Sequence, residues 1–422
     1  MSLDPEELRR KRFQHKRKRQ IAQRKLIIRL CIAAAVLVLS GVLILVFSLR
    51  NAPPAAENPA ETVAPTSPGE TAPEETTPPP TVIHFAATGN LNVTERVVAS
   101  GGSEYDYTKT FLDIAHILAN ADLTTVNLEG NLCGAPYGSS TSAPQSMMEA
   151  LKNAGVDMIQ LANSYSINRG ISGLITTIDN VEKAGMEPVG VFRDQEEYEK
   201  KQGFSLFEIE GIRIAVVSFT KGMVEGATLP PLNENCVNVL YTDYDSTYQK
   251  IDKDKIKEVM EAVEDQEPDI TIALLHWGSE VSDNISKSQK SIANLLQEYG
   301  ADAIIGTHPR YVHQVSLDPE KGTLVAYSLG DFIGDVPRAG SEYSIILDME
   351  ITKDHATGKT AITGFTYTPI FTVKEEGKPT RVVRIREAMA AYEAGYIDAV
   401  SKETYDAMAY ALTRIEQRVA GE

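Results

Sequence analysis

The chain contains little cysteine, with three residues in 422. Cys31 lies inside a long apolar segment, so Cys133 and Cys236 remain as the possible pair. Two cysteines form neither a disulfide framework nor a cysteine-based metal motif. The sequence therefore excludes a small disulfide-stabilised module, and it leaves a single disulfide open.

Positive charge is scarce beyond the first 29 residues. The net charge is −17, and residues 1–29 carry 11 Lys and Arg against 3 Asp and Glu, so residues 30–422 carry a net charge of −25. Nucleic-acid binding needs clustered Lys and Arg at the phosphates. The acidic part argues against nucleic acid as a partner, and any binding of another polyanion must rest on a local basic patch.

One segment lacks charge altogether. Residues 30–49 are 20 residues without Asp, Glu, Lys or Arg, which matches a hydrocarbon core of ~30 Å at ~1.5 Å per residue. The basic run at 9–19 precedes this segment and predicts a cytoplasmic N-terminus. A cleaved signal peptide is the alternative, but its apolar region usually has only ~7–15 residues. We predict an uncleaved, single-pass anchor in the cell membrane, with the bulk of the chain extracellular.

Residues 51–81 contain nine Pro, six Thr and five Glu but no Lys. Such a composition favours an extended spacer that buries no core. The predicted organisation is a basic N-terminus (1–29), a transmembrane anchor (30–49), a spacer (50–81), an α/β domain (82–373) and a C-terminal helical appendage (374–422).

The α/β prediction rests on apolar runs that alternate with helices. Runs such as IALL and AII show no alternation, which is typical of strands buried on both faces. Gly155 and Gly185 follow two amphipathic segments as C-terminal caps. Residues 223–250 show no period and predict a long loop near the mouth of a site. We expect a layered sandwich of mixed β-sheets flanked by helices.

Polar side chains follow the predicted strands where each strand ends. In open α/β sheets a ligand site lies beyond the carboxyl ends of the strands. The six residues at these ends are Asn90, Glu129, Asn163, His276, His308 and Asp331. Imidazole, amide and carboxylate are the ligands of divalent-metal hydrolases. Each residue alone could instead cap a helix or occupy a turn, but their shared placement predicts one site.

Several motifs resemble those of one family. They are ATGN at 87–90, VNLEG at 126–130, LANSYSINRG at 161–170, LLHWGSE at 274–280, GADAIIGTHP at 300–309 and YSLGDF at 327–332. In their order they resemble the CapA family, the poly-γ-glutamate capsule biosynthesis proteins, over about Val82 to Val373. The resemblance implies a metallophosphoesterase-like (calcineurin-type) fold and a membrane-anchored protein.

The chain departs from the family pattern at three positions. Asn90 stands where the resemblance implies Asp, Tyr165 where it implies His, and Arg310 where it implies a second His. His313 lies three residues beyond Arg310 and is the candidate to substitute for that second His, although the spacing differs. Four positions of the pattern are kept, namely Glu129, Asn163, His276 and His308, and Asp331 adds a carboxylate.

These residues support three predictions of function. The first is a surface component of anionic-polymer biosynthesis or export, with a polymer and other polymer-synthesis membrane proteins as partners. The second is a hydrolase of phosphoester or amide bonds that uses one Mn, Fe or Zn ion. The third is a scaffold without catalysis, in which Arg310 binds an anion. The predicted metal ligands are Asn90, Glu129, Asn163, His276, His308 and Asp331; the predicted catalytic residues are His276 and His308; the predicted substrate-binding residues are Tyr165, Arg310 and His313.

Overall fold

The structure, a computed structural model, describes residues 78–138, 141–334, 340–397 and 399–422. Within these residues no helix is both long and apolar enough to cross a membrane. The predicted anchor at 30–49 and most of the predicted spacer lie outside the described residues.

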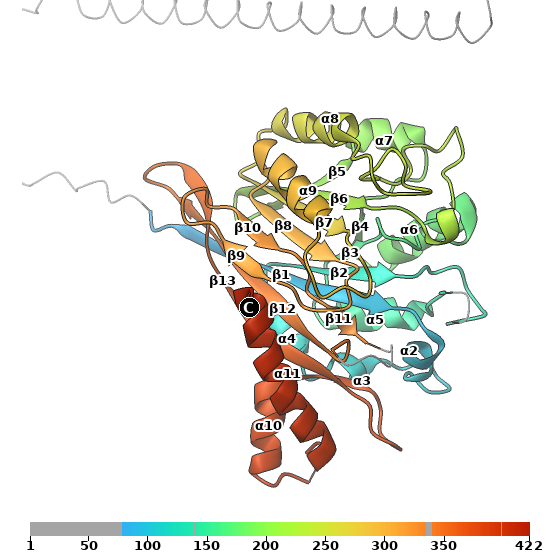
Figure 1. Cartoon of the computed structure of the whole chain (residues 1–422), viewed down its shortest axis with the longest axis vertical. Coiled ribbons are helices and arrows are strands. Elements are labelled where there is room, and N and C mark those ends of the chain that lie inside the picture. Colours follow the sequence, from blue (N-terminus) through green and yellow to red (C-terminus); the bar gives the residue numbers. More distant parts are fainter. Residues whose placement is uncertain (1–77, 139–140, 335–339, 398) are drawn as a thin grey trace, which may run out of the picture. The chain divides into compact units, whose positions relative to one another are not determined.

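Two mixed β-sheets form the centre of the fold (Figure 1). The first has the order β14-β13-β12-β1-β2-β3-β4, with β11 pairing β1, and the second has the order β5-β6-β7-β8-β10-β9. The strands of the first sheet are β1 (Thr81–Asn92), β2 (Leu123–Glu129), β3 (Met158–Gln160), β4 (Glu187–Val189), β11 (Asp331–Ile333), β12 (Tyr343–Asp354), β13 (Lys359–Val373) and β14 (Arg381–Arg384). Those of the second are β5 (Phe204–Ile209), β6 (Ile212–Thr220), β7 (Ile270–His276), β8 (Ala303–Thr307), β9 (Val315–Leu317) and β10 (Leu324–Ala326).

The two sheets share one apolar core. Ile83 and Phe85 of β1 belong to the same buried cluster as Ile272 and Leu274 of β7. The alternate residues of β7, Ala273 and Leu275, belong to a second cluster on the other face of the sheet. Every residue of β7 is buried, which is the pattern of a strand covered on both faces.

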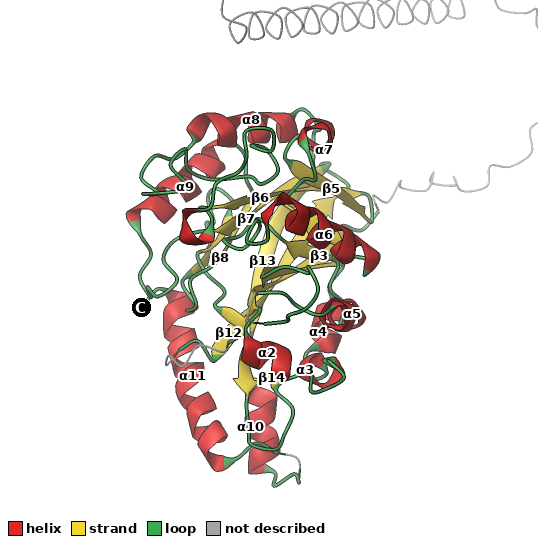
Figure 2. Ribbon diagram, turned by 90° about the vertical axis from the view of Figure 1, so that its right-hand side faces the viewer, coloured by secondary structure: helices red, strands yellow, loops and turns green. Residues whose placement is uncertain are grey.

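Helices cover the outer faces of the sheets (Figure 2). The helices of the described residues are α2 (Glu95–Ala99), α3 (Thr108–Phe111), α4 (Ala115–Asn120), α5 (Gln145–Asn153), α6 (Gly170–Lys183), α7 (Gln195–Lys201), α8 (Lys253–Glu264), α9 (Lys287–Glu298), α10 (Ile385–Glu393) and α11 (Lys402–Ala420). Of these, α10 and α11 instead contribute residues to the cluster that the two sheets share. The helix α9 begins with a capping box between Ser286 and Gln289, which satisfies backbone donors of the first turn. The predicted α/β sandwich of mixed sheets flanked by helices is confirmed.

The segment after residue 373 is not purely helical. Its strand β14 pairs with β13, so the first sheet continues into it. Met408, Ala411 and Ile415 of α11 are buried in the core between the sheets, so α11 packs on the domain. A four-residue strand shows too little periodicity to be found from sequence. Residues 223–250, predicted as a loop, contain a single short 3-10 helix at Val224–Gly226.

Candidate metal centre

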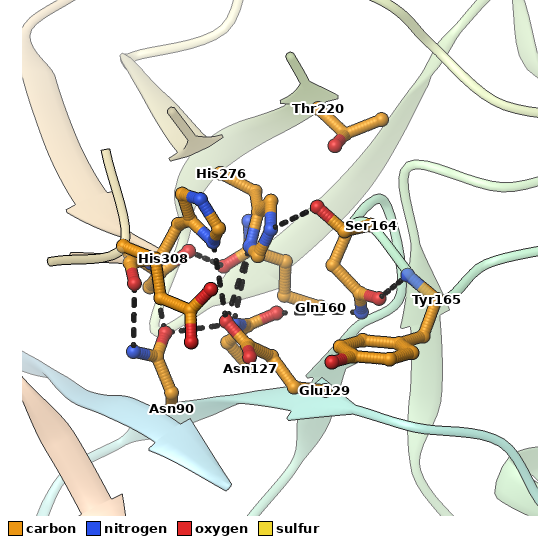
Figure 3. A network of polar contacts seen from close by, with 12 residues as sticks. Asn90, Asn127, Glu129, Gln160, Ser164, Tyr165, Thr220, His276 and His308 are labelled. Carbon is orange, nitrogen blue, oxygen red and sulfur yellow. Dashed lines mark hydrogen bonds and ion pairs between the residues drawn. The ribbon is translucent and has the colours of Figure 1, made fainter. Parts of the chain in front are cut away.

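The candidate site lies at the carboxyl edges of both sheets (Figure 3). In the first sheet, Asn90 of β1 lies in register with Asn127 of β2. In the second sheet, His276 of β7 lies in register with Thr307 of β8. The residues that follow these positions therefore meet where parallel strands end, as expected for a ligand site in an α/β fold.

Glu129, His276 and His308 form a compact buried cluster. The Oε1 atom of Glu129 lies 3.7 Å from Nδ1 of His276 and 3.7 Å from Nδ1 of His308. The two imidazole rings have centroids 4.4 Å apart and an interplanar angle of 47°. One ligand atom from each residue lies within 4.8 Å of the others. One carboxylate and two imidazoles at this spacing can hold a divalent cation.

Three atoms of this cluster have no hydrogen-bond partner in the described part of the chain. They are Oε1 of Glu129 and both ring nitrogens of His308, and all three are buried. An unsatisfied buried polar group costs about 1–3 kcal/mol, and native proteins keep few of them. These three atoms are free to contact a bound species, and the donor set fits a metal ion.

Burial sets the protonation of the cluster. It raises the pKa of Glu129 to about 7, and Arg310 opposes this shift. Burial also lowers the pKa of His308 to about 3, with a further lowering by Lys221. The pKa of His276 lies well below its usual value, chiefly through burial and the neighbouring His308. Both imidazoles are therefore neutral at pH 7 and keep the lone pairs that a metal requires.

Neighbouring side chains orient the two histidines. The Oγ atom of Ser164 lies 3.0 Å from Nε2 of His276, which leaves Nδ1 facing Glu129. The Oδ1 atom of Asn90 accepts a hydrogen bond from the backbone N–H of His308 at 2.8 Å. His308 has a φ of +87°, a conformation that a non-glycine residue rarely adopts without support. Asn90 thus holds the strained backbone that aims the imidazole.

Asn90 and Asn163 use their amides in hydrogen bonds within the protein. The Oδ1 atom of Asn90 also accepts from Nδ2 of Asn127 at 3.0 Å. For Asn163, Oδ1 accepts from the N–H of Tyr165 at 2.9 Å, and Nδ2 donates to the carbonyl of Leu128 at 2.6 Å. The structure therefore gives both asparagines positioning contacts beside the cluster.

Asp331 pairs with Arg310 at the edge of the site. Its Oδ2 atom lies 3.3 Å from Nη1 of Arg310, and its Oδ1 atom accepts from Nδ2 of Asn90 at 3.0 Å. Arg310 also contacts Oε1 of Glu280 through Nε at 2.8 Å and through Nη2 at 2.7 Å. The guanidinium of Arg310 is thus compensated by two carboxylates.

The remaining predicted residues differ in their placement. Tyr165 is half-buried, and its pKa is raised by burial and then by the charge of Glu129. His313 lies apart from the cluster, where Nε2 is 3.1 Å from the carbonyl of Ser282, and burial lowers its pKa to about 4. Sequence reasoning missed Ser164 and Lys221. Lys221 directly follows the buried strand β6, the same signal that identified His276 and His308.

Comparisons with known proteins agree with the motifs. Residues 82–336 match the family described as bacterial capsule synthesis protein PGA_cap. The "Capsule biosynthesis protein CapA" of Bacillus anthracis is 26% identical over 249 residues, 57% of this chain and 56% of that protein. The "PGA biosynthesis protein CapA" of Bacillus subtilis (strain 168) is 24% identical over 216 residues, 51% of this chain and 52% of that protein. The chain thus matches about half the length of these curated relatives.

Among solved structures, the chain is similar to the calcineurin-like phosphoesterase YfkN from Bacillus subtilis. That match has a TM-score of 0.43 and 14% identity, and it covers 81% of this chain and 98% of the other. A phosphatase from Mycoplasma pneumoniae has a TM-score of 0.43 and 17% identity, covering 69% of this chain and 94% of the other.

Proposed function

Because the chain belongs to the bacterial capsule synthesis protein family, matched over residues 82–336, we propose that it serves the biosynthesis or export of an anionic polymer of the poly-γ-glutamate type. The names of the two relatives, both tied to capsule or PGA biosynthesis, support this proposal. We propose further that residues 30–49 anchor the chain in the cell membrane with the N-terminus inside. The described domain then lies outside the cell, together with other membrane proteins of polymer synthesis.

The observation that carries the site proposal is the buried cluster of Glu129, His276 and His308 with its three unpartnered atoms. We propose that these residues hold one Mn, Fe or Zn ion. When bound, such an ion polarises a phosphoryl or carbonyl oxygen as a Lewis acid and lowers the pKa of water.

The chain's own residues prepare this site. Ser164, at 3.0 Å from Nε2 of His276, fixes the ring so that Nδ1 faces the cluster, as partners of metal-binding histidines commonly do. His308 has two unpartnered ring nitrogens, so one can face the ion while the other faces a substrate. Arg310, paired with Asp331 and Glu280, also favours the ionised form of Glu129.

A metal-dependent hydrolase of phosphoester or amide bonds is the second candidate. The unpartnered donor set favours it, because a purely structural pocket has no need for a buried carboxylate beside two neutral imidazoles. The departures from the family pattern at Asn90, Tyr165 and Arg310 favour the third candidate, a scaffold that binds the polymer without cleaving it.

Complementation in the source bacterium tests the polymer proposal. Cells that lack the gene should lose surface polymer, and the wild-type gene should restore it. The His308→Ala variant should fail to restore polymer while it accumulates to the wild-type level in the membrane. Unchanged polymer in the deletion strain would refute the proposal. Turnover of p-nitrophenyl phosphate or of a γ-linked glutamate oligomer, lost in His308→Ala, would identify the hydrolase.

A further inference from the structure

Lys221 occupies a position equivalent to that of the predicted site residues. Thr220, the last residue of β6, lies in register with His276 of β7, which in turn lies in register with Thr307 of β8. Lys221 and His308 are thus the first residues beyond two strands that flank His276. Neighbouring strands lie ~4.8 Å apart, so their backbones are separated by roughly two strand spacings. A lysine side chain spans much of that distance.

Contacts hold the Lys221 side chain beside the cluster. Its backbone N–H donates to the carbonyl of His276 at 2.8 Å, and its Nζ donates to the carbonyl of Gly278 at 3.0 Å. The ammonium lies 5.2 Å from the ring centroid of Tyr248, which belongs to the long 223–250 loop. The charge of Lys221 acts on all three cluster residues, Glu129, His276 and His308.

The two cations beside the cluster differ in their compensation. Arg310 is neutralised by Asp331 and Glu280 at ion-pair distance. In the described ranges of the chain, Lys221 has no carboxylate at ion-pair distance, and the charges of Glu280 and Glu129 act on it only from farther away. Its contacts are the carbonyl of Gly278 and the ring of Tyr248. An ammonium has three donors, and a partly buried charge is normally paired. Lys221 therefore has both donors and charge available for an incoming anion.

We propose that Lys221 binds an oxyanion of the substrate, a phosphate or a carboxylate, next to the Glu129–His276–His308 cluster. This inference rests on the proposed function, and it names the residue that selects an anionic substrate. It also accounts for how a domain in a chain segment of net charge −25 accepts a polyanion. The contact is a single lysine without an ion pair at the strand ends, whereas Arg310 is held in ion pairs with Asp331 and Glu280.

The test measures anion binding by the full-length chain in detergent. The probes are inorganic phosphate and a γ-linked glutamate oligomer, titrated by calorimetry. Lys221→Met should lower the affinity for whichever probe the wild type binds, by about tenfold or more. The loss is large because hydrogen bonds to charged groups are strong. Lys221→Arg should stay within about threefold of the wild type. Lys183→Met, on the exposed side of α6, is the control and should leave the affinity unchanged.

A second variant separates anion binding from a structural role. Lys221→Gln keeps a donor for the carbonyl of Gly278 but carries no charge, so it should fold normally and still lose affinity. The slope of log Kd against log salt should also become shallower in this variant. A preference for phosphate or for the glutamate oligomer assigns the substrate class.

Two outcomes overturn the inference: wild-type affinity in both Lys221→Met and Lys221→Gln, or binding of neither probe by the wild type. Metal content is measured in the same samples. If the wild type holds no metal but Lys221→Gln still loses anion affinity, the metal proposal is contradicted and the Lys221 inference stands.

Discussion

Replacing Arg310 with Met tests the buried ion pair at the rim of the site. The substitution removes the guanidinium contacts to Asp331 at 3.3 Å and to Glu280 at 2.7 Å. The Glu280 side chain is 47% exposed, so that loss should cost about 0–1 kcal/mol. The Asp331 side chain is 0% exposed. Removing the partner of such a buried charge costs about 3–5 kcal/mol while it stays ionised.

The pH dependence of this loss has a defined sign. Burial raises the pKa of Asp331 to about 7, even though Arg310 opposes the shift. Without Arg310 the pKa in the folded state rises further, because the opposing charge is gone. Well below pH 7 the Asp331 carboxyl is protonated in both proteins, so the substitution lowers the free energy of unfolding only slightly. Above pH 7 the wild type keeps an ionised, paired carboxylate, and the stability difference should grow with pH.

Thermal unfolding of residues 78–422 in EDTA measures this difference. At about 2.1 cal/mol/K per residue, the unfolding entropy is about 0.7 kcal/mol/K, so 3 kcal/mol corresponds to a Tm shift of about 4 °C. Arg310→Met should therefore lower Tm by about 4 °C near pH 8 and by about 1–2 °C near pH 5.5. Arg386→Met removes an exposed pair with Glu416 and should change Tm little at either pH. An equal loss at both pH values, or a larger loss in acid, would refute the reasoning.

Three further predictions concern the site and its supports. Ser164→Ala should weaken metal binding about 10- to 100-fold in a chelator competition, because the His276 ring loses its partner at 3.0 Å; unchanged affinity would show that Ser164 does not orient the ring. Metal affinity should fall about tenfold per pH unit below pH 7, because a proton on Glu129 competes with the ion. Burial raises the pKa of Glu129 to about 7, and an affinity that stays constant from pH 5 to 7 would contradict this prediction. Gly306→Ala should destabilise by about 3 kcal/mol or more, since the added Cβ would lie 2.2 Å from the carbonyl oxygen of Tyr327. Gly364→Ala, with open space around the new Cβ, is its control, and equal Tm values for the two variants would contradict the packing argument.

The strands that carry the site were predictable because their pattern is unambiguous. β7 and β8 are short apolar runs, and both are buried throughout. Parallel strands place their carboxyl ends at one edge, so a residue such as His276 or His308 could be assigned to the site from its position alone. The helical segment over residues 108–120 is divided into α3 and α4. Its break at 112–114 has no Gly or Pro to mark it.

Side-chain partners could not be predicted in the same way. Asn90, Asn163 and Asp331 were expected at strand ends just as Glu129 was, yet Asn90 lies inside β1 and Asp331 begins β11. The polar atoms of all three bond to the protein itself. Whether a polar side chain bonds within the protein or stays available to a ligand depends on how the two sheets face each other. No local sequence pattern encodes that arrangement. The three-residue strand β11, which places Asp331 next to Asn90, is likewise too short to show a period. The location of the site was therefore more predictable than its donor set.

Metal content tests the central claim most directly. The full-length chain, purified without chelators, should contain about one Mn, Fe or Zn ion per chain by mass spectrometry of the elements, as expected for a single cluster of three ligands. The Glu129→Gln and His308→Ala variants should lose that metal while they keep the wild-type fold by circular dichroism. A wild-type chain that neither retains nor takes up these metals, or variants that bind them as well as the wild type does, would contradict the account.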